Sequence, residues 1–219
     1  MRGPGGGGRR WLRRCRHRAL GGRGGWGRLG GRGKWFDETR RYDEPVPPVA
    51  WEQACKTGIY VLDDHGRLLP AARDTVRICA DHGVALSFGH LSPQEMDALA
   101  EEMNAIGYTR AFIDHPFSEV FELDVPKMKR WADAGVRFAL TWDELSPLLG
   151  VDPQDIVAAI RAIGPEHFML SSDAGIPLLP PTVEAYRLLA ATLRAYGMTE
   201  AEMRQLMSGS AKEMVNLPA

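Results

Sequence analysis

The sequence predicts a parallel α/β fold for residues 58–219. Short apolar, β-branched or aromatic runs alternate there with amphipathic segments of helical periodicity, and no hairpin turn separates them. A doubly wound sheet and a (β/α) barrel share this local pattern. Glycines that end the helical segments recur every 24 to 33 residues, the length of one βα unit: Gly83, Gly107, Gly135, Gly164 and Gly197.

Four strands are expected, at residues 84–88, 109–113, 136–141 and 168–171. Each run is short and almost continuously apolar, which is typical of a parallel strand buried on both faces. An extra strand is considered at residues 59–62, before the first of these units.

The helices between the strands have clear start signals. Ser92 and Glu95 form a capping box around a proline at the first helical position, and Asp152 begins a similar Asp-Pro segment. Thr199 and Glu202 form a further capping box. The core face of the first of these helices has apolar residues at the i, i+3, i+4 and i+7 positions: Met96, Leu99, Ala100 and Met103.

Residues 1–34 differ in composition from the rest of the chain. They contain ten Arg, one Lys, thirteen Gly and no acidic residue, a net charge of +11. Because the whole chain has 27 basic and 28 acidic residues, residues 35–219 carry a net charge of −12. A segment so poor in apolar residues does not bury enough surface to offset its ordering entropy, so we expect disorder in residues 1–34.

Three interpretations of residues 1–34 are open. The segment could bind nucleic acid through the charge of its Arg side chains and through Trp11 and Trp26, which lie between them. The lack of acidic residues is typical of organelle-targeting peptides, but the segment has no Ser and no apolar helical face. A wrong start or a shifted reading frame would also produce such a segment.

Residues 35–57 contain three prolines and are interpreted as a connector.

Composition excludes several protein classes. With 44% hydrophobic and 25% charged residues, the chain resembles an ordinary globular protein, and no run of about 18 apolar residues would span a membrane. The three cysteines have no metal-ligand or redox spacing, and their odd number favours a reducing, cytoplasmic compartment. No Gly-rich phosphate-binding motif follows any predicted strand.

Polar residues of one kind follow three predicted strands. His90 follows the strand at 84–88, His115 follows the strand at 109–113, and Asp173 follows the strand at 168–171. In a (β/α) barrel the C-terminal strand ends meet on the face that holds the active site. Imidazole nitrogen and carboxylate oxygen suit Zn²⁺ and similar divalent ions. The three residues therefore predict a metal site, although a single histidine or aspartate at a strand end more often serves as a hydrogen-bonding or capping residue.

The other histidines are interpreted as structural. His65 lies in a turn signal, and His82 precedes a helix-ending glycine. His167 begins a strand, at the end opposite to catalysis, and His17 lies among arginines, a poor setting for a metal ligand.

Several sequence runs resemble the amidohydrolase superfamily, and in particular a group of amidohydrolase-like domain proteins. They are ALSFGHLSPQE from Ala85, IDHP from Ile113 and IGPEHFMLSSD ending at Asp173. The closing stretch from Met198 also resembles the final helix pair of this family, in which Asn-Pro-Ala often replaces residues 209–211. The resemblance covers about residues 58–217.

The resemblance implies a (β/α)₈ barrel with one or two divalent metals, of which this chain carries strands five to eight. His90 and His115 match the histidines of strands five and six, and Asp173 matches the aspartate of strand eight. The family's His-x-His pair on strand one and its Lys or Glu on strand four are not identifiable. We therefore expect residues 58–219 to be the C-terminal half of a barrel in a truncated or frame-shifted product, and favour this origin for residues 1–34.

The implied function is metal-dependent hydrolysis of a C–N or C–O bond in a small molecule by a metal-activated water, with Zn²⁺ expected and Mn²⁺ as an alternative. Asp173 would bind metal or accept the proton of the attacking water. A lyase reaction, a non-catalytic remnant and a nucleic-acid-associated protein are the alternatives. Because half of the site would be missing, we expect little hydrolase activity from this chain. We also expect the half barrels to associate with one another or to aggregate. A membrane partner is not expected.

Overall fold

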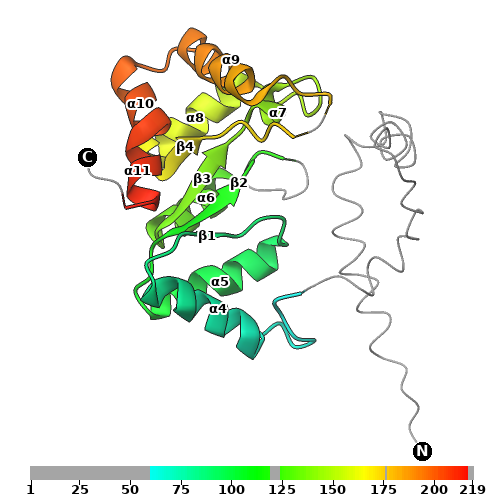
Figure 1. The fold of residues 1–219 in the computed structure, drawn as a ribbon, viewed down its shortest axis with the longest axis vertical. Helices are drawn as coiled ribbons and strands as arrows, with labels where there is room; N and C mark the ends of the chain where they lie inside the picture. Colours follow the sequence, from blue (N-terminus) through cyan, green and yellow to red (C-terminus); the bar gives the residue numbers. More distant parts are fainter. Residues whose placement is uncertain (1–59, 119–123, 176, 217–219) are drawn as a thin grey trace, which may run out of the picture.

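A computed structural model describes residues 60–118, 124–175 and 177–216 of the 219-residue chain. Its centre is a four-stranded parallel β-sheet flanked by helices (Figure 1). The predicted parallel α/β fold is therefore confirmed. The predictions for residues 1–34 and for the connector at 35–57 lie outside the described residues.

The strands follow one another across the sheet in chain order, β1-β2-β3-β4. β2 and β3 pair in parallel with Ala111 opposite Val136, and β3 and β4 pair with Phe138 opposite Phe168. All four predicted strands are present, although their hydrogen-bonded lengths are shorter than the apolar runs: β1 (Leu86–Ser87), β2 (Ala111–Asp114), β3 (Val136–Leu140) and β4 (Phe168–Leu170).

Helical segments occupy the connections between the strands and the C-terminal part of the chain. In Figure 1, α4 and α5 lie below β1 at one edge of the sheet and α8 and α9 lie toward β4 at the other edge, while α10 and α11 lie near the beginnings of the strands. The helices are α4 (Pro70–Asp81), α5 (Pro93–Ala105), α6 (Val125–Asp133), α7 (Trp142–Leu145), α8 (Pro153–Ile163), α9 (Thr182–Ala195), α10 (Glu200–Arg204) and α11 (Ser210–Met214), with a 3₁₀ turn η1 (Pro165–His167) and a π-helical turn η2 (Gln205–Gly209).

The expected helix starts are formed by the expected residues. The Ser92 hydroxyl accepts a hydrogen bond from the Glu95 amide, and the Glu95 carboxylate accepts one from the Ser92 amide, so the capping box of α5 is complete. The Asp152 side chain caps α8, and Thr199 with Glu202 caps α10. The predicted core face of α5 is buried: Met96, Leu99, Ala100 and Met103.

The two faces of the sheet are covered differently. Alternate strand residues such as Ile113, Phe138 and Phe168 belong to one large apolar core shared with helices α5, α6, α8 and α9. On the opposite face, Ala139 and Met169 form a small second cluster with Met214 of α11. Helix α11 thus covers part of the face away from the main core.

Arginine side chains connect the beginnings of the strands to the C-terminal helix. Arg110, just before β2, donates hydrogen bonds to the carbonyls of Gly83 and Met214. Arg137 in β3 pairs with Glu213 of α11. The C-terminal helix is therefore held at the end of the sheet opposite to the strand C-termini.

The extra strand considered at residues 59–62 is not formed by its described part. Leu62 makes only an isolated antiparallel bridge with Leu68, across a turn that includes His65. Leu62 is buried, so its apolar character reflects packing rather than pairing in the sheet. Ile59 lies outside the described residues.

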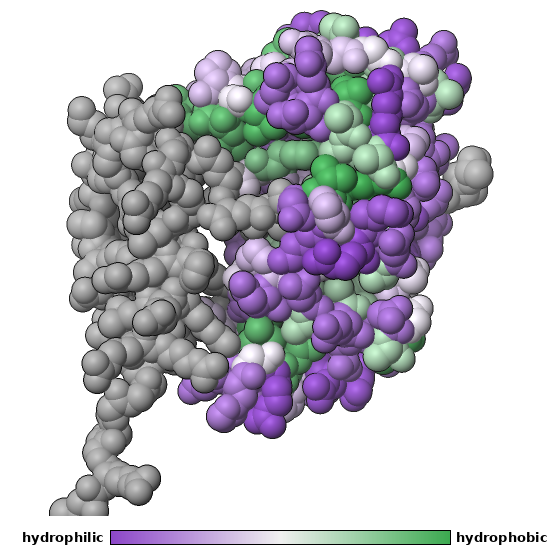
Figure 2. Space-filling model, turned by 180° about the vertical axis from the view of Figure 1, so that it is seen from behind, coloured by the Kyte–Doolittle hydropathy of each residue, from purple (hydrophilic) through white to green (hydrophobic). Residues whose placement is uncertain are grey.

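One face of the described residues is largely hydrophilic. In Figure 2, polar side chains cover most of the coloured part of this face, with apolar side chains in smaller patches between them. No helix in the described ranges is both long and apolar enough to cross a lipid bilayer.

Gly135, in the turn between α6 and β3, lies in close contact with Thr109, which comes just before β2. Its φ is +89°, and a Cβ placed there would lie 2.6 Å from the Cβ of Thr109. Gly135→Ala is therefore expected to lower the free energy of unfolding by about 2–4 kcal/mol, measured by urea denaturation. Gly150→Ala is the control, because Gly150 has a φ of +67° but no neighbouring atom within 4 Å of its Cβ position. Equal losses in both variants would show that steric contact with Thr109 is unimportant.

Candidate active site at the C-terminal ends of the strands

The chain places polar residues after the C-terminal end of every strand in the sheet. His90 follows β1, His115 follows β2, Asp143 follows β3 and Asp173 follows β4. Because the strands are parallel, these four connections emerge at the same edge of the sheet.

The two predicted histidines are in direct contact. The Nε2 atoms of His90 and His115 are 3.0 Å apart, and the ring centroids are 4.8 Å apart with the planes tilted by 43°. A hydrogen bond between these two atoms requires a hydrogen on one Nε2 and a lone pair on the other. His115 is buried and His90 is exposed, so the pair extends from the interior to the surface.

Asp173 lies beside this pair. Its Oδ2 atom is 3.9 Å from Nε2 of His115, and its side chain is 53% exposed. The structure thus brings together the three residues that the sequence analysis singled out, across β1, β2 and β4. These distances join His115 to each of the other two residues, and the assignment of all three as metal ligands stays a prediction.

Two of the three residues have a strained backbone. His115 has a φ of 35° and Asp173 a φ of 46°, in a left-handed region where residues other than glycine are uncommon. Such a conformation costs on the order of 1–3 kcal/mol and persists where surrounding contacts hold it. The His115 amide donates to the Ala139 carbonyl over 2.9 Å, and the His115 carbonyl accepts from the Ser118 amide over 3.0 Å.

Asp143 is a site residue that the sequence analysis missed. It interacts electrostatically with His115 and Asp173, and the Thr141 hydroxyl donates a hydrogen bond to its Oδ1. Burial raises the pKa of the Asp143 carboxyl, and the hydrogen bond from Thr141 and the nearby His115 oppose that increase. The strand-end rule applied to residues 136–141 would have identified it, because it lies two residues after that run.

Glu144 is also absent from the sequence prediction and is fully buried. It forms the capping box of α7 with Thr141. Burial raises the pKa of Glu144 to about 8, although hydrogen bonds from the Thr141 and Phe117 amides oppose the increase. Burial thus favours the neutral carboxyl of Glu144, whereas the two amide donors favour its charged form.

A second polar pair lies on neighbouring strands. The Ser87 hydroxyl donates to Oδ2 of Asp114 over 2.6 Å, and accepts a hydrogen bond from the Gly89 amide over 3.0 Å. Since Asp114 precedes His115 directly, this pair links the last residues of β1 and β2 next to the histidines.

The donor atoms suit a divalent ion in type and in part of their geometry. Two imidazole nitrogens on one tetrahedral Zn²⁺, with bonds of about 2.0 Å, lie about 3.3 Å apart, close to the separation seen here. Among the described residues, however, no three His, Cys, Asp or Glu side chains are already arranged as a group that could hold a metal ion. The site therefore provides a two-histidine pair with a carboxylate near it.

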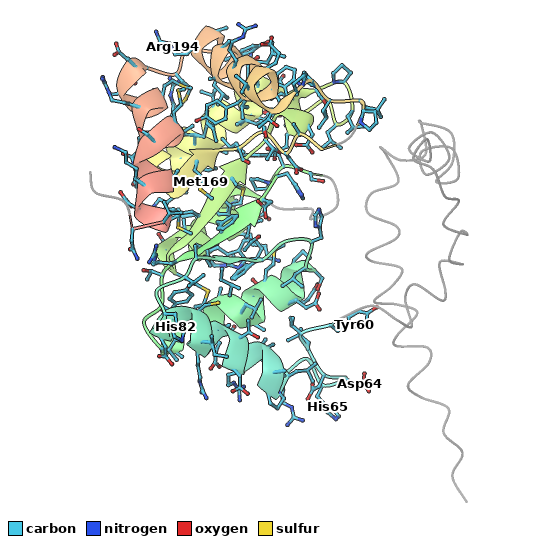
Figure 3. All side chains as sticks on the ribbon, in the orientation of Figure 1. Tyr60, Asp64, His65, His82, Met169 and Arg194 are labelled. Atoms are coloured by element: carbon cyan, nitrogen blue, oxygen red, sulfur yellow. The ribbon has the colours of Figure 1, made fainter. Side chains whose placement is uncertain are left out.

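The remaining described histidines lie away from this group. Figure 3 shows His65 in the turn before α4 and His82 at the far end of α4. His167 ends the turn before β4, and burial lowers its pKa. These placements agree with the structural roles expected for them; His17 lies outside the described residues.

A family described as "Family of unknown function (DUF6282)" matches residues 32–139, slightly less than half of the chain. The matched range includes His90 and His115 but not Asp173. No curated protein and no solved structure matches the chain.

Proposed function

We propose that this protein is a metal-dependent hydrolase of the amidohydrolase type, with His90, His115 and Asp173 as its metal-binding residues. The observation that carries the proposal is the 3.0 Å contact between the two Nε2 atoms, with the Asp173 carboxylate 3.9 Å from one of them. Imidazole and carboxylate ligands favour Zn²⁺, with Mn²⁺ as the alternative.

The strand order supports a partial (β/α) barrel as the scaffold. Each strand pairs with the next one along the chain, and each connection includes a helix. A doubly wound sheet has a point at which the strand order reverses and the ligand binds, whereas these four strands contain no reversal. The polar residues instead gather at the C-terminal strand ends, where barrel enzymes have their active sites.

The residues present suit hydrolytic chemistry at this edge. A bound divalent ion would supply an acidified water and polarise the scissile bond of the substrate. Asp173, exposed beside His115, would accept a proton at Oδ2 and return it to a leaving nitrogen or oxygen. Asp143 lies close enough to His115 and Asp173 for their charges to act on its own carboxyl.

The proposal is tested by metal binding to the full chain. Isothermal titration with Zn²⁺ is expected to give one saturable site, and His115→Ala is expected to weaken it by more than about 100-fold, because removing a ligand costs more than removing a supporting residue. His65→Ala is the control, since His65 lies in an exposed turn. Equal affinities in the wild type and His115→Ala would contradict the proposal.

A second measurement addresses the reaction. Zinc-loaded protein is assayed with a panel of amides, lactones and esters, together with His90→Ala and His65→Ala. Because half of the family's site is expected to be missing, at most weak turnover is expected in the wild type and in His65→Ala, and none in His90→Ala. Metal binding with no turnover of any substrate would restrict the site to binding.

A further inference from the structure

The two side-chain oxygens of Glu144 accept hydrogen bonds from two different parts of the candidate site. Oε2 accepts a hydrogen bond of 2.8 Å from the Thr141 amide, within the cap of α7. Oε1 accepts one of 2.7 Å from the Phe117 amide, in the connection that follows β2. Helix capping requires only the first of these bonds, so the second connects α7 to a different loop.

The loop that Glu144 reaches is the one that carries His115. Phe117 is two residues after His115, whose backbone is held in the left-handed region. On the other side, the His115 amide is bonded to the Ala139 carbonyl of β3. His115 is therefore held against β3 by its own amide and against the start of α7 by the bond from Phe117 to Glu144.

Glu95 shows that this chain uses the same arrangement elsewhere. It completes the capping box of α5, and its Oε1 accepts a hydrogen bond of 3.2 Å from the Val61 amide. In both cases a buried capping glutamate also bonds to the backbone of an earlier segment. At Glu144 that segment is the one that presents a site histidine.

We infer that Glu144 is a positioning residue that sets the location of the His115 imidazole relative to His90. The inference rests on the proposed metal site for its functional meaning, whereas the geometry concerns the two rings alone. Glu144 bonds to backbone amides and to the Thr141 hydroxyl, so it acts on the histidine through the loop. Removal of the carboxylate would leave the Phe117 amide without this acceptor and release the loop.

The test uses the full chain with Glu144→Gln, Glu144→Ala and the control Glu202→Gln. Glu202 is also a capping-box glutamate, in α10 outside the site. Co²⁺ affinity is measured by absorbance, and the imidazole signals of the metal-free protein by proton–nitrogen correlation spectra. Glu144→Ala is expected to weaken Co²⁺ binding by about 10- to 100-fold and to move the His90 and His115 signals while those of His65 stay unchanged.

Glu144→Gln retains one oxygen acceptor, so its losses are expected to lie between those of the wild type and the alanine variant. It also provides a folded comparison if the alanine variant is unstable. Unchanged His115 signals in folded Glu144→Gln and Glu144→Ala would overturn the inference, as would equal shifts in Glu202→Gln. If the wild type binds no Co²⁺, the proposed function fails, and the imidazole signals alone decide the inference.

Discussion

The free energy of unfolding is expected to fall, relative to that of the Glu144→Gln variant, as pH rises from 4.5 to about 8. Burial raises the folded-state pKa of Glu144, so in this range the folded chain keeps a proton that the unfolded chain has lost. The contribution of protonated Glu144 to the free energy of unfolding is therefore complete below pH 4.5. It is lost as pH rises through the folded-state pKa of Glu144. In this range the free energy of unfolding, relative to that of Glu144→Gln, falls by about 1 kcal/mol or slightly more per pH unit.

Urea denaturation of the wild type and of Glu144→Gln at several pH values measures this difference directly. Taking the difference removes the contributions of other groups, such as His167, whose lowered pKa has the opposite effect at acidic pH. Glu202→Gln serves as the control, because hydrogen bonds from Thr199 lower the pKa of Glu202. Parallel stability curves for the wild type and Glu144→Gln would show that Glu144 does not carry a raised pKa.

Phe138→Ala is expected to lower the free energy of unfolding by about 3–5 kcal/mol. Phe138 is fully buried in the centre of β3, and its ring centroid lies 5.2 Å from that of Phe168 in β4. The substitution leaves a cavity in the main core and removes the contact that joins two strands of the sheet.

Thermal or urea denaturation measures this loss, and Val183→Ala provides the comparison. Val183 is 80% exposed, so truncating it is expected to change the free energy of unfolding by less than about 0.5 kcal/mol. A loss of similar size in both variants would contradict the central place of Phe138 in the core.

Much of the local structure could be predicted from the sequence because local interactions decide it. Ser92 with Glu95, Asp152, and Thr199 with Glu202 satisfy helix-terminal amides within three residues, so their pattern marks the helix starts directly. The predicted apolar runs also lie where the strands form, although the hydrogen-bonded part of each strand is shorter than its run. Residues 59–62 show the limit of this reasoning. Leu62 is apolar because it packs in the interior, and it does not pair with a strand of the sheet.

The candidate site was predictable in part for a similar reason. His90, His115 and Asp173 each follow a strand directly, so the parallel arrangement alone brings their backbones to one edge. The same rule reaches Asp143, which lies two residues after the apolar run at 136–141. It does not identify Glu144, whose carboxylate is paired with a loop 27 residues earlier in the chain.

By itself, the sequence determined the alternation of strands and helices, the helix starts and the polar character of the strand ends, because each depends on neighbouring residues. Only the tertiary structure decided the strand order, the packing of α11 on the second face of the sheet, and the 3.0 Å contact between His90 and His115. These features depend on contacts between residues far apart in the chain, and periodicity and spacing carry no information about such distances. The strained backbone of His115 belongs to this second group, since the hydrogen bond to Ala139 that holds it forms only when β2 and β3 are side by side.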